Sequence, residues 1–444
     1  MDHDALKDFT TFLSFQSVST DPAYKPELLN CCDWVCDYLK DIGFEVEVWE
    51  TSGHPTIYAH YLKAGPDKPT LLTYNHYDVQ PVDPVEEWSH PPFEPHIENG
   101  KVYARGASDN KGQCFYTLLA MKTLLKNEGK LPINVKMVIE GEEEIGSSGL
   151  DEILETKKEK LRADYIAIVD SGMNSPTKPA ITLGMRGIVT MEVTARGSNS
   201  DLHSGMVGGM VFNPIHALVH TFSQIRDPKT GRILIPGFYD QVKTLTPLEK
   251  EQLKNGGDPD AFLEPFKAKP TGGERALNAW ERVWMQPTLE VNGITGGYTG
   301  EGFKTVIPQV AKAKVSCRLV PDQDPKKMGM LVGDALIACA PDGIDITVSI
   351  LAGSGRAARG NPDSPIVHAF SKAYKEVFNH QPELIYSGGS VPISARLQEV
   401  SMGEIVFVGL ALATDNFHAP NEHFSIERID QGCQSMINML KHLS

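Results

Sequence analysis

The chain has 444 residues, of which 41% are hydrophobic and 22% charged. Such a composition is typical of folded globular domains and excludes disorder as the main state. At about 150 residues per domain, the length suggests roughly three folding units. The 57 acidic residues exceed the 42 basic ones and give a formal net charge of −15. This balance argues against nucleic acid or an anionic membrane as a partner, because both attract basic surfaces.

The longest apolar run, residues 405–413, has nine residues, whereas a membrane-spanning helix needs about 20. The N-terminal MDHDALKD has neither the basic nor the apolar stretch of a secretory signal. We therefore expect a cytoplasmic protein. Of the seven cysteines, Cys31, Cys32 and Cys36 cluster on an expected helix. Their spacing allows a metal or redox pair, but in a reducing cytoplasm we expect free thiols.

Helical and strand patterns alternate in the first part of the chain. Helices are expected at residues 6–15, 28–43 and 112–127, and strands at 44–50, 70–74, 134–139 and 163–170. Strands that alternate with helices predict an α/β domain with a mainly parallel central sheet flanked by helices.

The pattern changes near Gly184. Alternating strands are expected at 188–196, 310–320 and 344–351, a helix at 214–225, and surface helices and loops at 227–287. Strands with one solvated face predict a smaller α+β domain. A helix at 364–378 and a buried strand at 405–413 then return to the first pattern. We expect residues 1–184 and 356–444 to form one domain into which residues 185–355 are inserted.

Reactive side chains in an open α/β sheet gather at the carboxyl ends of the strands. The strand at 70–74 is followed by His76 and Asp78. These residues are two apart in an extended chain, so their side chains point the same way. A carboxylate beside a histidine can orient a metal-binding imidazole. The alternative is an ordinary surface or core histidine whose hydrogen bonds are satisfied.

Two further junctions carry carboxylates. Asp109 stands between a glycine-rich loop and a helix, where it could instead be the helix N-cap. The strand at 134–139 is followed by four glutamates in five residues: Glu140, Glu142, Glu143 and Glu144. A helix dipole accounts for one or two of them. A bound cation would relieve their repulsion, with one glutamate as ligand and its neighbour free as a base.

The remaining expected strands also lead to possible ligands. Asp170 ends the strand at 163–170, and His418 follows the strand at 405–413. Each residue alone is unremarkable. Together, histidine and carboxylates at one sheet edge predict a two-metal hydrolytic site of the zinc type.

Five motifs occur in a fixed order: NHYDVQP (75–81), YARGASDNKG (103–112), EGEEEIGS (140–147), DLHSG (201–205) and NFHAPNE (416–422). Over nearly the whole chain, the sequence resembles the dinuclear zinc metallopeptidases that include carnosinase-type dipeptidases, aminoacylase, carboxypeptidase G and succinyl-diaminopimelate desuccinylase. The resemblance implies a zinc exopeptidase-like catalytic domain, an inserted lid and dimerisation domain at 185–355, and a homodimer.

The resemblance also implies roles for individual residues. Two Zn²⁺ ions per subunit, or Mn²⁺ or Co²⁺, would be held by His76, Asp109, Glu144, Asp170 and His418. Asp109 would bridge both ions, and its peptide bond to Asn110 is expected to be cis. Asp78 would orient His76. Glu143 would be the general base for a bridging-water nucleophile. His203, in the inserted domain, would act in trans in the partner subunit's site and stabilise the oxyanion.

Substrate contacts are implied by the carnosinase-type branch, which TVIP (305–308), CRLVP (317–321) and GGSVP (388–392) resemble. There the arginine that matches Arg318 binds the C-terminal carboxylate of the substrate, a task suited to a guanidinium fork. The alternative for Arg318 is a surface charge at a strand end. Thr305, Gly389 and Ser390 are further candidate contacts.

These features favour a metal-dependent hydrolase that cleaves the amide bond of dipeptides or short peptides. The alternative is a deacylase of N-acyl amino acids, with the same metals and a different pocket. A non-catalytic metal-binding protein is a third hypothesis, but the intact Glu143 argues against it.

Overall fold

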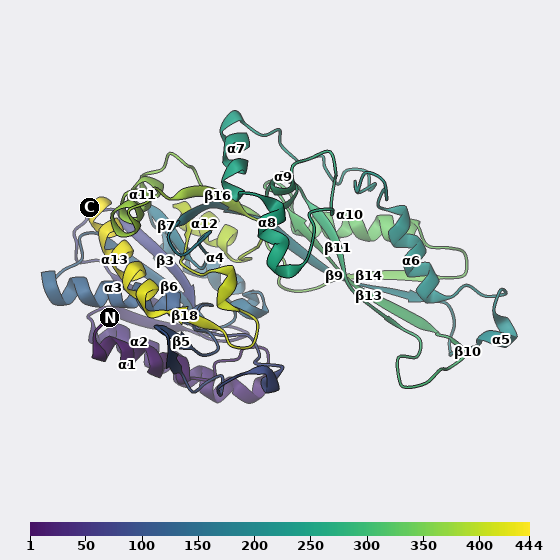
Figure 1. Ribbon diagram of the computed structural model, residues 1–444, viewed down its shortest axis with the longest axis horizontal. Helices are drawn as coiled ribbons and strands as arrows, with labels where there is room; N and C mark the ends of the chain where they lie inside the picture. The colour runs from purple at the N-terminus through teal and green to yellow at the C-terminus, as the bar shows by residue number, and fades with distance from the viewer. The chain divides into compact units, whose positions relative to one another are not determined.

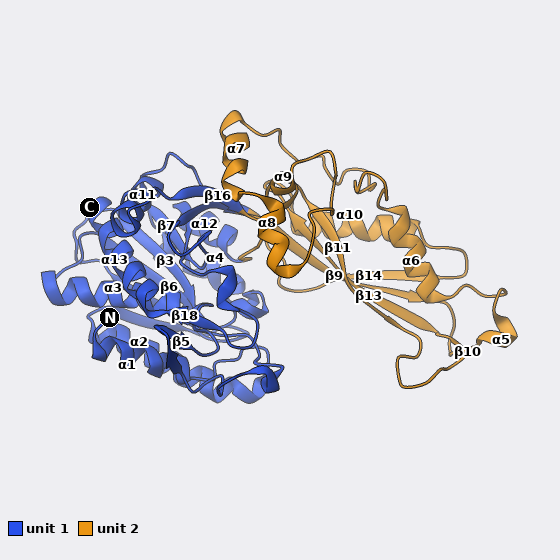
Figure 2. Cartoon of the chain, in the orientation of Figure 1, with its two compact units in different colours: residues 1–184, 358–386, 393–444 blue, residues 185–357, 387–392 orange.

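The computed structural model describes residues 1–444, which divide into two compact units (Figure 2). Unit 1 consists of Met1–Gly184, Ala358–Tyr386 and Ile393–Ser444. Unit 2 consists of Met185–Ala357 and the short segment Ser387–Pro392, which comes from the C-terminal part of the chain.

Unit 1 is built on a nine-stranded sheet, of which Figure 1 labels β3, β6, β7 and β16. The strand order is β1-β2-β6-β3-β7-β17-β8-β15, with β16 also paired to β8. The strands are β1 Glu45–Trp49, β2 Thr56–Tyr61, β3 Thr70–His76, β6 Asn134–Glu140, β7 Tyr165–Val169, β8 Ala180–Met185, β15 Ala358–Arg359, β16 Glu383–Ser387 and β17 Glu404–Val408. The four central strands, β6, β3, β7 and β17, are parallel, whereas β1, β2 and β8 pair antiparallel with their neighbours. The predicted α/β class is confirmed, with a sheet that is mixed at its margins.

The helices of unit 1 flank this sheet. They are α1 His3–Ser14, α2 Lys25–Asp41, α3 Lys111–Glu128, α4 Ser148–Leu161, α11 Pro365–Phe378, α12 Ser394–Ser401 and α13 Ile426–His442. The central helix α3 packs against both α1 and α13, and it ends at Gly129, whose φ of 71° suits a glycine C-cap. The predicted helices at 6–15, 28–43, 112–127 and 364–378 are confirmed, with ends shifted by a few residues.

The prediction of one strand over residues 405–413 was too long, because β17 ends at Val408. At Gly409 the chain comes so close to Ser171 that a Cβ atom would lie 2.0 Å from the Ser171 carbonyl oxygen. Leu410 remains buried after the strand has ended. Apolar burial therefore continues where strand pairing stops, and the pattern of residues alone does not separate the two.

Unit 2 contains a four-stranded antiparallel sheet in the order β11-β13-β9-β14. Its strands are β9 Gly187–Arg196, β11 Thr288–Gly296, β13 Val310–Leu319 and β14 Asp345–Ile350. Buried and less buried residues alternate along β9, as a strand with one covered face requires. The covered face packs with α6 Pro214–Gln224 and α10 Pro325–Ala338 in one hydrophobic core. The strands and the helix predicted for this part are confirmed.

The rest of unit 2 consists of short elements. The short strands β10 Leu202–His203 and β12 Val306–Ile307 pair with each other as a two-stranded ribbon. The helix α5 Ser204–Val207 follows directly after β10. The segment predicted as surface helices and loops contains α7 Pro247–Gln252, α8 Pro259–Leu263 and α9 Ala279–Trp284. Unit 1 also holds a small sheet of β4 His96–Glu98, β5 Lys101–Tyr103 and β18 His423–Ser425 that the sequence did not predict.

No helix in residues 1–444 is both long enough and apolar enough to cross a membrane. All seven cysteines are free, and Cys31, Cys32 and Cys36 are buried.

Candidate metal centre

His76 is the last residue of β3, and both of its ring nitrogens lie next to carboxylates. Nε2 lies 3.2 Å from Asp109 Oδ1, while Nδ1 lies 3.0 Å from the backbone oxygen and 3.3 Å from Oδ1 of Asp78. Burial disfavours the charged ring, but Asp109 and Asp78 outweigh this effect and raise the pKa of His76 well above its usual value. The fully buried Asp78 also accepts the backbone N–H groups of Glu143 and Glu144, at 3.2 and 3.1 Å. Asp78 therefore joins the end of β3 to the acidic segment after β6.

Asp109 presents its two carboxylate oxygens to two different histidines. Oδ1 faces His76, and Oδ2 lies 3.0 Å from His418 Nε2. This is the arrangement needed in a carboxylate that bridges two cations. The peptide bond between Asp109 and Asn110 is cis, as the resemblance implied. The alternative that Asp109 caps a helix is wrong, since Asn110 occupies the N-cap position of α3.

The acidic segment after β6 divides into residues with different surroundings. Glu144 Oε2 lies 3.3 Å from His418 Nε2 and accepts Gln80 Nε2 at 2.7 Å, while Glu144 Oε1 is buried without a hydrogen-bond partner. One ligand atom each from His76, Asp109 and Glu144 lies within 4.8 Å of the others. Glu142 points elsewhere, because its carboxylate accepts His54 N at 3.0 Å and Leu150 N at 2.9 Å.

Asp170 and Glu143 bring two further carboxyl groups to the same buried region. Asp170 Oδ1 lies 3.9 Å from His76 Nε2 and accepts Asn110 Nδ2 at 2.9 Å. Burial raises the pKa of Asp170 to about 7. Burial, together with the charge of Asp170 and other nearby carboxylates, raises the pKa of Glu143 well above its usual value.

The donor set fits divalent cations of the zinc type. Imidazole nitrogens and carboxylate oxygens are the ligands that such ions take when no thiolate is present. Buried carboxylates that face one another are costly unless a positive charge compensates them. The unpartnered Glu144 Oε1 is an atom that a cation would satisfy. The structure thus brings the five predicted ligands together with Asp78 and Glu143, all within unit 1.

The other predicted site residues lie in unit 2. Exposed His203 pairs with Val306 in the β10–β12 ribbon, and its Nδ1 accepts Gly205 N at 3.0 Å. Thr305, directly before β12, accepts Ser204 N with its backbone oxygen at 3.1 Å.

Arg318 is half-buried at the end of β13, and its Nη1 donates to Ser390 Oγ at 2.8 Å. The neighbouring Gly389 carbonyl accepts Arg186 N at 3.0 Å, and the Gly388 carbonyl accepts Arg186 Nε at 3.0 Å. Arg318 is therefore part of a built polar cluster rather than an isolated surface charge.

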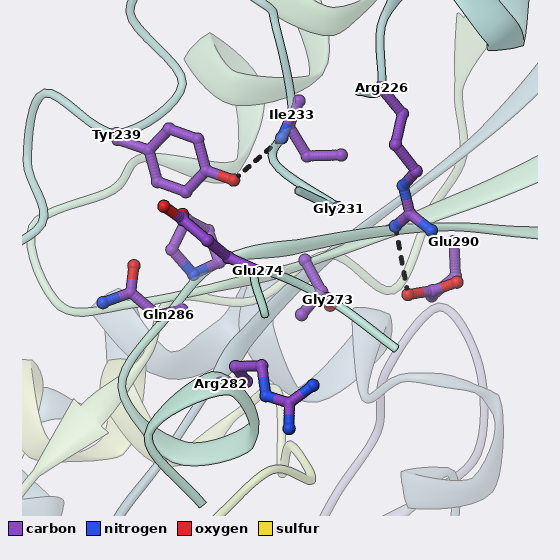
Figure 3. Close-up of a pocket in the computed structure, with 11 residues that line it drawn as sticks. Arg226, Gly231, Ile233, Tyr239, Gly273, Glu274, Arg282, Gln286 and Glu290 are labelled. Atoms are coloured by element: carbon purple, nitrogen blue, oxygen red, sulfur yellow. Dashed lines mark hydrogen bonds and ion pairs between the residues drawn. The ribbon is translucent and has the colours of Figure 1, made fainter. Parts of the chain in front are cut away.

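A separate small pocket lies in unit 2 (Figure 3). Tyr239 Oη accepts Ile233 N at 3.1 Å on one side of it, and Arg226 Nη2 lies 3.5 Å from Glu290 Oε1 on another. None of the predicted site residues lines this pocket.

Sequence reasoning missed several buried polar residues that support the centre. Asn110 donates to Asp170 Oδ1 and to the Val169 carbonyl, both at 2.9 Å. Two buried ion pairs, Arg105–Glu422 and Arg428–Asp415, were also missed. The only signal for them was the position of Glu422 within the NFHAPNE motif.

Glu140 provides a test of the electrostatics next to the centre. Its buried carboxylate accepts the hydroxyl groups of Tyr74 and, at 2.8 Å, Ser147, and burial raises its pKa to about 8. A folded state that holds this proton more tightly than the unfolded chain loses stability as pH rises between the two pKa values. We expect Glu140→Gln to lessen the fall in unfolding free energy between pH 5 and pH 8. Urea unfolding of both proteins in chelator measures this, and an identical pH dependence would contradict it.

Comparison with known proteins supports the resemblance. The family model described as "Peptidase family M20/M25/M40" matches residues 72–442. The Cys-Gly metallodipeptidase dug1 of Schizosaccharomyces pombe is 30% identical over 97% of this chain and 94% of its own. The beta-Ala-His dipeptidase of Homo sapiens is 31% identical over 94% of this chain and 85% of its own.

Solved structures agree over the whole chain. An M20 family metallo-carboxypeptidase from Sulfolobus solfataricus has a TM-score of 0.88 at 34% identity, covering 100% of this chain and 99% of its own. The dipeptidase Dug1p from Saccharomyces cerevisiae has a TM-score of 0.85 at 26% identity, covering 99% and 95%. The predicted family is confirmed: the chain belongs to peptidase family M20/M25/M40 and is a metallopeptidase.

Proposed function

We propose that this metallopeptidase is a dipeptidase, which hydrolyses the amide bond of dipeptides or short peptides with free termini. The observation that carries the proposal is the convergence of His76, Asp109 and Glu144 in a chain whose full-length relatives are named dipeptidases. The polar cluster around Arg318 supports it, because a half-buried guanidinium suits a substrate carboxylate.

We infer that two Zn²⁺ ions, or Mn²⁺ or Co²⁺, are held in this centre. His76 and Asp170 would bind one ion, Glu144 and His418 the other, and Asp109 would bind both. When bound, ions of this kind would polarise the amide carbonyl and lower the pKa of a bound water towards about 7.

The side chains then divide the work of hydrolysis. Glu143 takes the proton of the attacking water and delivers it to the leaving amide nitrogen, which is general base and then general acid catalysis. Asp78 holds the His76 ring on one side and the backbone of Glu143 on the other. Arg318 pairs with the substrate carboxylate, with Thr305, Gly389 and Ser390 as further contacts. The buried free cysteines support a reducing, cytoplasmic location.

We further propose that unit 2 is a lid and dimerisation domain, and that His203 stabilises the oxyanion in the site of a second subunit. Large apolar side chains near His203 and Thr305 in the sequence are strongly exposed: Met206 is 78%, Met210 80% and Phe303 91% accessible. Exposed apolar side chains that gather in one region are typical of interaction sites.

The trans role of His203 predicts complementation between two inactive variants. Glu143→Gln and His203→Ala should each have low activity as pure dimers. In a mixed dimer, one site combines Glu143 of one chain with His203 of the other, so mixing after dissociation and reassociation should restore activity. Activity that stays at the sum of the two pure variants, in a mixture whose heterodimers are shown by native mass spectrometry, would contradict the trans role.

The substrate class is tested with matched substrates. The wild-type enzyme with Zn²⁺, Mn²⁺ or Co²⁺ is assayed on dipeptides, on the same dipeptides with an amidated C-terminus, and on N-acetyl and N-succinyl amino acids. We expect the highest kcat/KM on the free dipeptides and a lower value on the amides, which lack the carboxylate for Arg318. Higher kcat/KM on the N-acyl amino acids would instead identify a deacylase.

A further inference from the structure

The Glu422 carboxylate, at the end of the NFHAPNE motif, is fully buried and accepts four hydrogen bonds. Oε1 accepts the backbone N–H groups of Ser108 and Asp109, both at 2.9 Å. Oε2 accepts Gly106 N and Arg105 Nη1, both at 2.8 Å. Every donor lies in the segment that leads to the bridging candidate Asp109.

The loop that carries His418 is attached to the same segment at both ends. Glu422 binds it at one end. At the other end, Asp415 Oδ2 accepts Ser108 Oγ at 3.1 Å. Both carboxylate oxygens of Asp415 also accept hydrogen bonds from the Arg428 guanidinium, at 2.6 Å each. Between these ends, Asn416, His418 and Asn421 have φ values of 58°, 60° and 62°. This left-handed conformation is uncommon among non-glycine residues, although asparagine and histidine adopt it more often than most.

The two attachments act on two ligand candidates at once. Asp109 Oδ2 and His418 Nε2 lie 3.0 Å apart, and each belongs to one of the joined segments. We propose that Glu422 is a positioning residue of the metal centre, which fixes the Asp109 backbone and the His418 loop to each other and so sets the spacing of the two ligands. The inference rests on the metal centre proposed above.

The chemistry of the contact explains why a carboxylate is required. Each oxygen of Glu422 faces two donors, so the amide NH₂ of a glutamine would meet two N–H groups on one side. The change would also leave the 1%-exposed Arg105 guanidinium without its counter-charge. A residue that only stabilised the fold would lower the unfolding free energy when changed, but it would leave metal affinity and ligand geometry unaltered.

The test is a titration of metal-free protein with Co²⁺. Calorimetry measures the affinity and the number of ions bound, and the visible absorption of the bound ion reports the ligand geometry. Wild-type protein should bind two ions per chain. We expect Glu422→Gln to weaken Co²⁺ binding about 10- to 100-fold, the usual effect of losing a partner that orients a ligand, and to alter the absorption spectrum.

Asn134→Ala is the matched control, because Asn134 is also buried and lies at the start of β6, the strand end opposite to the acidic segment. Its side chain accepts Ala64 N and donates to the carbonyls of Gly65 and Lys68. This variant should lose stability yet keep the wild-type Co²⁺ affinity and spectrum.

The outcomes separate the inference from the proposal on which it rests. Two Co²⁺ ions in wild type with unchanged affinity and spectrum in folded Glu422→Gln would overturn the positioning role alone. Fewer than two ions in wild type would overturn the proposed metal centre and the inference with it. If Glu422→Gln does not fold, Glu422→Asp decides: its charge is kept but its reach is shorter, so weaker Co²⁺ binding supports the role and wild-type binding overturns it.

Discussion

Glu143→Gln is expected to lower kcat for dipeptide hydrolysis by about 10³-fold, within the range of about 10² to 10⁴ typical of general acid–base groups. Glutamine has nearly the same shape but cannot accept the proton of the attacking water. Glu143 is not among the ligand candidates. The metal ions would instead be held by neighbouring residues such as Glu144 and His418. The variant should therefore retain both metal ions, and KM should change little.

Glu142→Gln is the control for this change, since Glu142 is an adjacent buried carboxylate that undergoes the same substitution. It accepts His54 N, in the loop between β1 and β2, and Leu150 N, in α4, so it serves these two backbone segments rather than the reaction. It should lower stability while keeping kcat close to that of wild type. Near-normal kcat in metal-loaded Glu143→Gln would exclude Glu143 as the base, and loss of metal from this variant would make it a ligand instead.

Asp109→Ala is expected to remove both metal ions, whereas Asp170→Ala should remove only one. The difference follows from geometry, because each oxygen of Asp109 faces a different histidine, while Asp170 lies close to His76 alone. Metal ions supply several kcal/mol of transition-state stabilisation in hydrolases, and each 1.36 kcal/mol is about a tenfold change in rate. Activity of Asp109→Ala should consequently fall by about 10³-fold or more.

Metal content per chain, measured after gel filtration, distinguishes these two variants. The Glu422 contacts to residue 109 involve its backbone N–H, so Asp109→Ala leaves them in place and the loop should remain folded. Two ions retained by Asp109→Ala would show that Asp109 does not bridge them. Equal losses in the two variants would place Asp170 in a shared role as well.

The ends of the central strands could be predicted because their physical signals are local. The apolar strands that end near His76, Glu144 and Asp170 are parallel neighbours, so their carboxyl ends lie at one sheet edge. The family resemblance added what the pattern could not, such as the proposal that Asp109 is a metal ligand rather than a helix N-cap. In the acidic segment, the sequence alone could not separate the helix-binding Glu142 from Glu143 and Glu144.

The residues that sequence reasoning missed act through contacts that are remote along the chain. Glu422 and Asp109 are 313 positions apart in the chain, and no periodic pattern around either residue predicts their contact. Arg428, in α13, forms an ion pair with Asp415, which precedes the helix in the chain. The apolar spacing of α13 predicts which residues face the core, but it does not predict this ion pair. The strand predicted at 405–413 was too long for a local reason, because apolar burial continues at Leu410 after strand pairing has ended.

Reconstitution of the metal-free enzyme tests the central claim most directly. Protein stripped with a chelator is titrated with Zn²⁺ while the initial rate of dipeptide hydrolysis is recorded. The proposed two-metal centre predicts negligible hydrolysis without metal and a rate that rises to a plateau at two equivalents per chain. Full hydrolysis in excess chelator, or a protein that binds no Zn²⁺, would contradict it.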